Sequence, residues 1–165
     1  MCGIVGIYLK TKKFEKNLGK MLSGMLNNME SRGPDSAGFA IYKNSEKKEY
    51  KYSLCINNLD FSKFKKNISN KIKKLKLNKY SDHVIVKTTE IPKKFIKLIH
   101  EEFPEVSIVG YGHSIEIFKQ VGNPKDVVKK FNLESFSGTH GIGHTRMATE
   151  SAITTDGSHP YSTGE

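Results

Sequence analysis

Residues Met1-Cys2-Gly3-Ile4-Val5-Gly6 open the chain and place a cysteine directly after the initiator methionine. Methionine is normally removed before a side chain as small as cysteine, so Cys2 is expected to become the N-terminal residue. It would then carry a thiol and a free α-amine, and an N-terminal cysteine activated by its own amine is a recognised nucleophile. Because the ordinary pKa of the amine is about 7.7–8.0, part of it is neutral at pH 7 and able to accept the thiol proton. The alternative is that Cys2 is simply a small buried residue at the start of a strand.

The charge of the chain comes almost entirely from lysine. The 165 residues carry 27 Lys and Arg against 17 Asp and Glu, a net charge of +10, and the only arginines are Arg32 and Arg146. Proteins that recognise nucleic acids usually use arginine forks and stacking aromatic side chains, whereas here lysines crowd residues 61–80. We interpret this segment as a solvated basic face and predict no specific nucleic-acid partner. A basic nucleic-acid-binding module stays as the alternative function.

The sequence predicts neither a membrane span nor a signal peptide. No apolar run approaches the roughly 18 residues of a spanning helix, and the opening residues lack a charged leader and a cleavage site. We therefore expect a cytoplasmic protein with no membrane partner. The two cysteines are not expected to form a disulfide, and Cys55 lies in an apolar stretch typical of a core strand.

The first third of the chain predicts a strand, a helix and a second strand. Residues 3–9 form an apolar run of strand length. One apolar stripe then predicts a helix that ends at Arg32-Gly33-Pro34, because Gly suits a helix end and Pro cannot continue it. Residues 35–38 are small and polar and are expected to form a tight turn into a strand at 39–42. The helical stripe comprises Leu18, Met21, Leu22, Met25, Leu26 and Met29.

Residues 44–121 are expected to form an inserted small αβ subdomain. Strands are predicted at 52–56, 83–87, 106–110 and 114–120. One helix should begin after Asp60 as N-cap, and a second should lie between Pro92 and Pro104. This β-α-β-α-β-β order can close a core of its own. Residues 1–43 and 122–165 are assigned to the other domain. The apolar face of the first helix comprises Phe61, Phe64, Ile68, Ile72 and Leu75, and His83, His100 and His113 are expected to have no convergent partners.

Residues 138–146, GTHGIGHTR, predict a strand that ends in an arginine. The planar fork of Arg146 suits a substrate carboxylate, although an arginine at a strand end is also typical of a surface ion pair. The glycine order does not match a dinucleotide-binding fingerprint. The spacing of His140, His144 and His159 with Cys2 matches no zinc pattern. We therefore expect no cofactor and no metal.

Four stretches together resemble one family. MCGIVG, RGPDSAG, GHTRMATES and SHPYSTGE occur in the order and wording of the class II glutamine amidotransferases, which the chain resembles closely over residues 1–42 and 138–165. The resemblance is strongest to the amidotransferase subunits of glutamate synthase-type and N-methylglutamate synthase-type enzymes. Glucosamine-6-phosphate synthase, with RGYDSAG and HTRWATHG, and amidophosphoribosyltransferase are the alternatives within the family. The resemblance implies an α+β fold, the four-layer αββα sandwich of the N-terminal-nucleophile hydrolases.

The resemblance also implies a reaction and a site. Cys2 would attack the side-chain amide of glutamine, form a thioester and release ammonia, and water would then release glutamate. The ammonia would pass to a partner synthase subunit or domain, for which a flavin-dependent, glutamate synthase-like enzyme is the expected type. Arg146 would clamp the glutamine α-carboxylate, Met147 and Thr149 would line the same pocket, and His159 would shape its wall. Structural support of the site would come from Gly3, Arg32, Asp35 and Ser36.

Two further elements of the family's site have no counterpart in residues 1–165. The family places an oxyanion-hole Asn-Gly pair after the SHP turn, and an Asp beyond it that holds the glutamine α-amine. Loss of one oxyanion donor alone lowers the rate by about 10²–10³. We therefore expect a domain that is incomplete at its C-terminus, truncated or split, and inactive alone. A non-catalytic fragment is the corresponding alternative.

Overall fold

The computed structural model describes residues 2–44, 48–148 and 153–163. They form a mixed α/β structure with two antiparallel four-stranded sheets and four α-helices, compatible with an α+β fold. The chain divides into two compact units, one of residues 1–44 and 117–161 and one of residues 45–116 and 162–165. The units are described separately below.

The sheet of the first unit places the opening strand beside the last strand of the chain. β8 lies between β1 and β2, and it is antiparallel to both. β7, which sequence analysis placed in the inserted segment, completes this sheet at its other edge. The division into a glutaminase domain and an insertion stays a prediction. In spatial order the strands are β1 (Gly3–Tyr8), β8 (His140–Arg146), β2 (Ser36–Tyr42) and β7 (Ile115–Val121).

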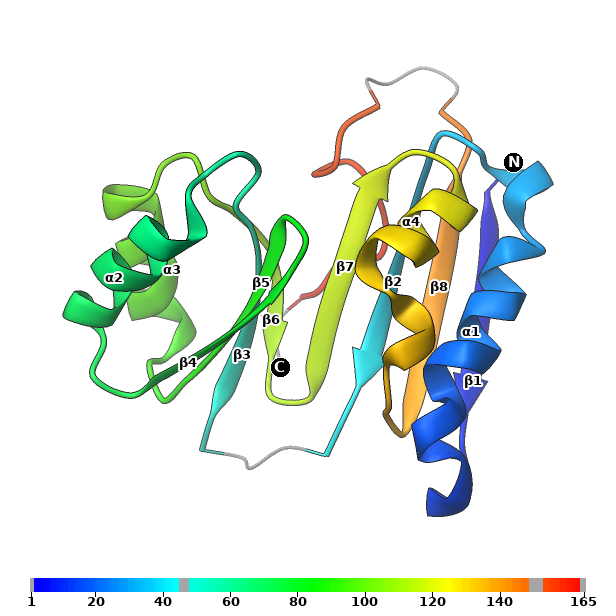
Figure 1. Ribbon diagram of the computed structural model, residues 1–165, viewed down its shortest axis with the longest axis horizontal. Helices are drawn as coiled ribbons and strands as arrows, with labels where there is room; N and C mark the ends of the chain where they lie inside the picture. The colour runs from blue at the N-terminus through cyan, green and yellow to red at the C-terminus, as the bar shows by residue number, and fades with distance from the viewer. Residues whose placement is uncertain (1, 45–47, 149–152, 164–165) are drawn as a thin grey trace. The chain divides into compact units, whose positions relative to one another are not determined.

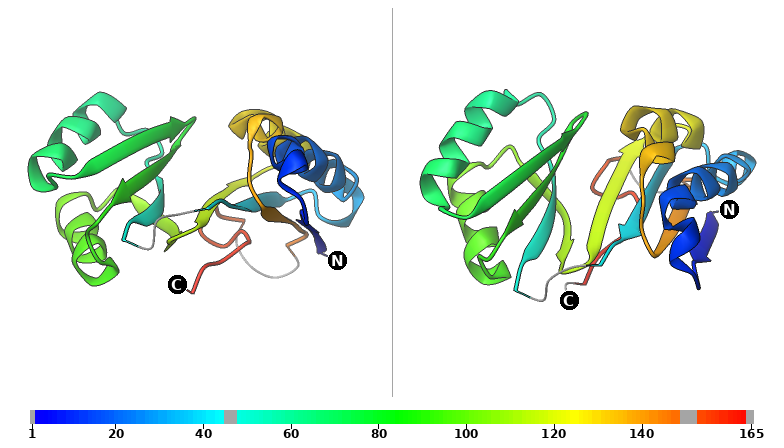
Figure 2. Two further views of the ribbon diagram at one scale, coloured as in Figure 1. Left: turned by 90° about the horizontal axis from the view of Figure 1, so that it is seen from below. Right: turned by 60° about the horizontal axis from the view of Figure 1, so that its bottom comes forward.

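Two helices, α1 (Leu18–Asn27) and α4 (Pro124–Phe131), cover one face of this sheet (Figures 1 and 2). The predicted apolar stripe is confirmed, with Leu18, Leu22 and Leu26 fully buried. The helix ends five residues earlier than predicted, and a 3-10 turn, η2 (Glu30–Arg32), continues the chain to Gly33. Two further 3-10 segments are η1 (Lys12–Asn17) and η3 (Leu133–Ser135). Phe39 of β2 joins the helices to the sheet through ring contacts with Phe118, Phe131 and Phe136.

Glycines in β8 allow α1 to approach closely. A Cβ on Gly143 would lie 2.9 Å from Val5 Cγ2 and 3.0 Å from Leu26 Cδ1. Because side chains alternate between the faces of a strand, His140, Ile142 and His144 then lie on the face that the helices leave uncovered. The glycines of GIGHTR therefore serve helix packing.

The turn predicted at residues 35–38 is wrong beyond Asp35. Ser36, Ala37 and Gly38 belong to β2 and pair with Arg146, Thr145 and His144 of β8. Their side chains are small because the strand is buried on both faces at this point. Small residues such as these are also typical of turns, which explains the wrong prediction.

The second unit has its own sheet and core. Helices α2 (Phe61–Lys71) and α3 (Pro92–Glu102) pack on it, and the Tyr52 and Phe95 rings stack 3.8 Å apart at its centre. The predicted N-cap is confirmed, because the Asp60 side chain accepts a hydrogen bond of 2.9 Å from the Lys63 amide. At 11 residues each, α2 and α3 are the longest helices described, and no described helix could cross a membrane. The strands in spatial order are β4 (Leu75–Tyr80), β5 (His83–Thr88), β3 (Tyr50–Cys55) and β6 (Ser107–Gly112).

Strand β4 was not predicted. Leu75 was assigned to the apolar face of the preceding helix, but α2 ends at Lys71 and Leu75 begins β4. β4 lies at the edge of the sheet, where Leu75 and Leu77 alternate with the exposed Lys76 and Asn78. Such an alternation is easily taken for the end of a basic helix.

Candidate active site

Cys2 and Arg146 come from neighbouring strands at one end of the first sheet. Gly3 pairs with Thr145 across β1 and β8, so Cys2 directly precedes the residue opposite Thr145. On the other side of β8, Ser36 pairs with Arg146. The Cys2 thiol is free and solvent-exposed. Figure 1 shows the first residues of β1 and the last residues of β8 at the same end of the sheet. The antiparallel pairing of β1 with β8 therefore brings Cys2, at the start of the first motif, to the end of the sheet where Arg146 lies.

Two glycines permit this close assembly. A Cβ on Gly3 would lie 2.8 Å from Thr145 Oγ1, and one on Gly33 would lie 2.6 Å from the backbone N and C of Arg146. Thr145 is fully buried and donates a hydrogen bond of 3.2 Å to the Met29 carbonyl. Gly33, the first glycine of RGPDSAG, thus lets the loop after α1 lie against the backbone of Arg146.

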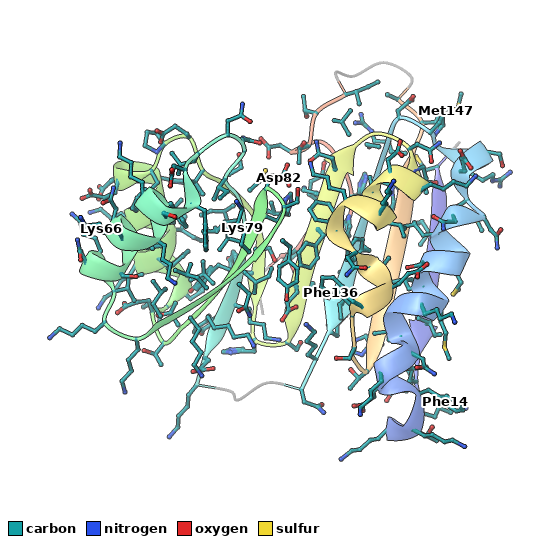
Figure 3. All side chains as sticks on the ribbon, in the orientation of Figure 1. Phe14, Lys66, Lys79, Asp82, Phe136 and Met147 are labelled. Atoms are coloured by element: carbon teal, nitrogen blue, oxygen red, sulfur yellow. The ribbon has the colours of Figure 1, made fainter. Side chains whose placement is uncertain are left out.

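Asp35 holds the chain on both sides of Met147. Its amide donates to the Arg146 carbonyl over 3.1 Å, and its carboxylate Oδ2 accepts from the Ala148 amide over 2.7 Å. Met147, which lies between these anchors, is 47% exposed. Figure 3 labels its side chain. Thr149, the next residue proposed for the pocket, lies outside the described residues. Asp35 is therefore a positioning group for the segment that follows β8.

The other two support residues differ in burial. Ser36 is fully buried, and its Oγ has no hydrogen-bond partner in the part of the chain that the structure describes. Arg32 is exposed in η2. Of the two, Ser36 lies directly beside Arg146 in the sheet.

Residues 153–161 cross the uncovered face of the sheet at Gly38. A Cβ on Gly38 would collide with the His159 carbonyl and lie 2.7 Å from Lys119 Cβ. The Lys119 side chain, only 2% exposed, donates to the carbonyls of Asp156 and Ser158 over 3.1 and 3.0 Å. Its Nζ also lies 4.4 Å from the centre of the Tyr161 ring. A buried lysine thus fastens this segment to β7.

The segment brings His159 to His144 and to Arg146. The centroids of the two imidazole rings are 4.4 Å apart, and a Cβ on the neighbouring Gly157 would lie 3.5 Å from Arg146 Nη1. Burial is the main cause that lowers the pKa of His144 from 6.5 to about 4, and the neighbouring His159 and Arg146 contribute to the same shift. Burial also lowers the pKa of His159, assisted by Lys119 and Arg146. Both rings are therefore neutral at pH 7.

Sequence analysis named His159 here but missed Lys119 and gave His144 no role beyond a rejected zinc pattern. A usable signal existed for His144, because residues two apart on a strand share a face and Arg146 follows it by two. Lys119 lies in an apolar strand, and its burial depends on backbone carbonyls of residues 156 and 158. No pattern in the sequence predicts these hydrogen bonds to Lys119.

The histidine pair predicts a pH-dependent stability. Because the folded-state pKa of His144 is about 4 and its ordinary value is 6.5, the unfolded chain binds more protons between these values. Stability then rises with pH across that window, and is lost as pH falls from about 6.5 towards 4. His144→Asn should flatten this part of the curve of unfolding free energy against pH, measured by urea denaturation. His100→Gln, on the exposed side of α3, serves as control, and an unchanged slope in His144→Asn would contradict the prediction.

Two glycine-to-alanine changes of opposite sign test the close approach at Gly38. Gly38→Ala should destabilise the protein by about 1–3 kcal/mol, because its Cβ meets backbone that cannot yield without moving residues 153–161. Gly24→Ala is the matched control, since nothing lies within 4 Å of its Cβ in α1. It should stabilise the protein by about 0.5–1 kcal/mol through helix propensity. Chemical denaturation measures both, and a Gly38→Ala protein as stable as Gly24→Ala would refute the contact.

Comparison with known proteins shows which proteins the chain is similar to. No protein-family model matches the chain. The glutamine amidotransferase-like protein GlxB of Rhizobium meliloti (strain 1021) is 43% identical over 167 residues, which cover 99% of this chain and 56% of that protein. The chain is homologous to glutamine amidotransferase-like proteins, and this confirms its resemblance to the class II glutamine amidotransferases.

Two further relatives extend the comparison. A putative glutamine amidotransferase of Methanothermobacter thermautotrophicus is 30% identical over 173 residues, 98% of this chain and 56% of that protein. A glutamine–fructose-6-phosphate aminotransferase (isomerizing) of Methanococcus maripaludis is 34% identical over 65 residues, 39% of this chain and 11% of that enzyme. The chain thus spans little more than half the length of the two relatives that match nearly all of it.

Proposed function

We propose that the protein containing this chain hydrolyses glutamine to glutamate and ammonia through a thioester on Cys2. The observation that carries the proposal is the register of β1, β8 and β2, which sets an exposed Cys2 thiol at the sheet end that carries Arg146. The amidotransferase names of the relatives agree with this substrate class. A thiol can attack an amide carbon, and a guanidinium can bind a carboxylate of the same small substrate.

The proposed reaction has two steps, formation of the thioester and its hydrolysis. The Cys2 α-amine takes the thiol proton, and the thiolate attacks the amide carbon of the glutamine side chain. The carbon–nitrogen bond then breaks, and the departing nitrogen takes the proton from the α-ammonium to leave as ammonia. A water molecule, deprotonated by the same amine, attacks the thioester and releases glutamate with a free thiol. No oxidant or reductant is needed.

We assign the glutamine α-carboxylate to the Arg146 guanidinium, which can form two parallel hydrogen bonds with it. With His144 and His159 neutral, the cationic groups of this cluster are Arg146 and Lys119, and the Lys119 ammonium already donates to the Asp156 and Ser158 carbonyls. Met147 and Thr149 would line the pocket and His159 its wall. Gly3, Asp35 and Ser36 would support these groups through the strand pairing and hydrogen bonds around Arg146. Arg32 would brace the strand of Cys2.

For the fold we propose the four-layer αββα sandwich of the N-terminal-nucleophile hydrolases. The first unit supplies one helix layer and one sheet. On the face without helices, Ile4 is 75% exposed, Tyr8 71% and Ile142 37%. Exposed apolar side chains along one sheet face favour a second layer packed against them. The greater length of the relatives offers material for that layer in the whole protein.

The ammonia acceptor would be a synthase subunit or domain, with a flavin-dependent, glutamate synthase-like enzyme as the expected type. We further propose that residues 44–121 are an insertion in the glutaminase domain. The separate core of the second unit supports this, because it packs Tyr52, Phe64 and Phe95 without residues of the first unit. A cytoplasmic location stays a prediction.

The mechanism requires a free amine on Cys2, so the active protein should lack Met1. Intact-mass measurement of the purified whole protein should give the sequence mass less one methionine. A variant with one alanine inserted between Met1 and Cys2 keeps a residue in front of the cysteine even after Met1 is removed. It should lose glutamine hydrolysis without a change of fold. Glutaminase activity in protein that retains Met1 would overturn the proposed role of the amine.

A further inference from the structure

The second unit brings a cysteine, an aspartate and a histidine together at one end of its sheet. Cys55, the last residue of β3, is the direct cross-strand partner of His83, the first residue of β5. Asp82 precedes His83 in the β4–β5 turn, at the tip of that hairpin (Figure 3). One donor atom from each of the three residues lies within 4.8 Å of the other two. Sequence analysis treated Cys55 and His83 as unrelated core or surface residues, because 27 intervening positions separate them.

The surrounding hydrogen bonds fix the three residues. The Ile56 amide, next to Cys55, donates to the Asp82 carbonyl over 2.8 Å and so ties β3 to the turn. His83 Nδ1 lies 2.9 Å from Asp82 Oδ1, and Cys55 Sγ lies 3.2 Å from Asn57 Oδ1. Cys55 and His83 are 2% and 0% exposed, while the Asp82 side chain keeps 18% of its surface in contact with solvent. Two members of the cluster are therefore buried, and Asp82 is the member that reaches solvent.

The donor set has the chemistry of a zinc site. Thiolate sulfur, imidazole nitrogen and carboxylate oxygen are the three ligand types that Zn²⁺ uses in proteins, whereas Ca²⁺ and Mg²⁺ require oxygen ligands. A thiolate and a carboxylate together balance two positive charges. Metal–ligand lengths of about 2.0–2.3 Å place tetrahedral donors about 3.3–3.8 Å apart. His83 Nδ1 and Asp82 Oδ1, 2.9 Å apart, are already at about this spacing, and donors as far apart as 4.8 Å would approach by about 1–1.5 Å through side-chain rotation.

We propose that Cys55, Asp82 and His83 bind a divalent ion of the Zn²⁺ type, with solvent in the fourth position. The ion would join the end of β3 to the β4–β5 hairpin and so stabilise the second unit. This site is independent of the proposed glutaminase chemistry, because none of its three residues belongs to the first unit.

Titration of the metal-free whole protein with Co²⁺ tests the proposal. We expect a single equivalent to produce the near-ultraviolet thiolate-to-cobalt absorption and the intense visible bands of four-coordinate cobalt, and Zn²⁺ to displace it. Cys55→Ser should remove the thiolate band, and Cys2→Ser should leave it unchanged. Absence of the band in the wild-type protein, or its loss in Cys2→Ser with retention in Cys55→Ser, would overturn the site.

Two further measurements keep the test decisive if Cys55→Ser does not fold. Asp82→Asn, at a partly exposed turn position, should weaken Co²⁺ binding about tenfold or more. In the wild-type protein, Zn²⁺ should slow alkylation of Cys55 in mild urea, while Cys2 reacts at the same rate with and without the ion. Unchanged affinity in Asp82→Asn together with equal Cys55 alkylation in both conditions would refute the proposal.

Discussion

Replacing Cys2 by serine is expected to abolish glutamine turnover by the whole protein while glutamine still binds. A serine hydroxyl is a far weaker acid than a thiol, so the α-amine cannot generate the nucleophile at neutral pH. The expected fall in kcat is about 10³-fold or more, the scale of losing a catalytic nucleophile. Steady-state ammonia release gives kcat, and calorimetric titration gives the affinity for glutamine.

Cys55→Ser is the matched control, since it makes the same sulfur-to-oxygen change at a cysteine that is 2% exposed in the other unit. Its activity per folded molecule should equal that of the wild type. Serine is also small enough for Met1 to be removed before it, so the Cys2→Ser protein keeps a free terminal amine. Wild-type turnover in Cys2→Ser would show that another group attacks the amide.

Arg146→Lys is expected to weaken glutamine binding by about ten- to a hundredfold and to change kcat much less. Lysine keeps the charge but cannot offer two parallel hydrogen bonds, and one charge-assisted hydrogen bond contributes about 1.5–3 kcal/mol. Since the α-carboxylate does not react, the loss should fall chiefly on KM. Initial rates at several glutamine concentrations separate the two constants.

Lys97→Arg provides the reverse exchange at an exposed surface ion pair with Glu101, and it should leave both constants unchanged. Circular dichroism should show that Arg146→Lys retains the fold. A selective fall in kcat with KM unchanged would mean that Arg146 acts on the reacting amide and does not hold the carboxylate.

Patterns along the chain predicted the elements that pack by simple periodicity. The buried positions of α1 recur every four residues at Leu18, Leu22 and Leu26, as the stripe indicated. Asp60 caps α2 through the expected side-chain hydrogen bond. Errors arose where tertiary contacts override composition. Residues 36–38 of β2 are small because the strand is covered on both faces, and small residues without that contact are typical of a turn.

In the candidate site, too, some features follow from local sequence patterns and others depend on tertiary contacts. Cys2 and Arg146 stand out as residue types within short motifs, and strand pairing brings their positions together. The environment of Arg146 is different, because it depends on residues 153–161 folding back over Gly38. Lys119 holds that segment through two backbone carbonyls, which have no sequence signature. Likewise, the Cys55–His83 pairing follows from the register of β3 and β5, and register cannot be obtained from either strand alone.

The most direct test of the nucleophile is reaction of the whole protein with a glutamine-mimicking electrophile, followed by peptide mass spectrometry. The account predicts a single adduct on a peptide that begins at Cys2 and lacks Met1, formed far faster than any reaction at the buried Cys55. Excess glutamine should slow its formation. An adduct on Cys55, or on a peptide that still carries Met1, would contradict Cys2 as the N-terminal nucleophile.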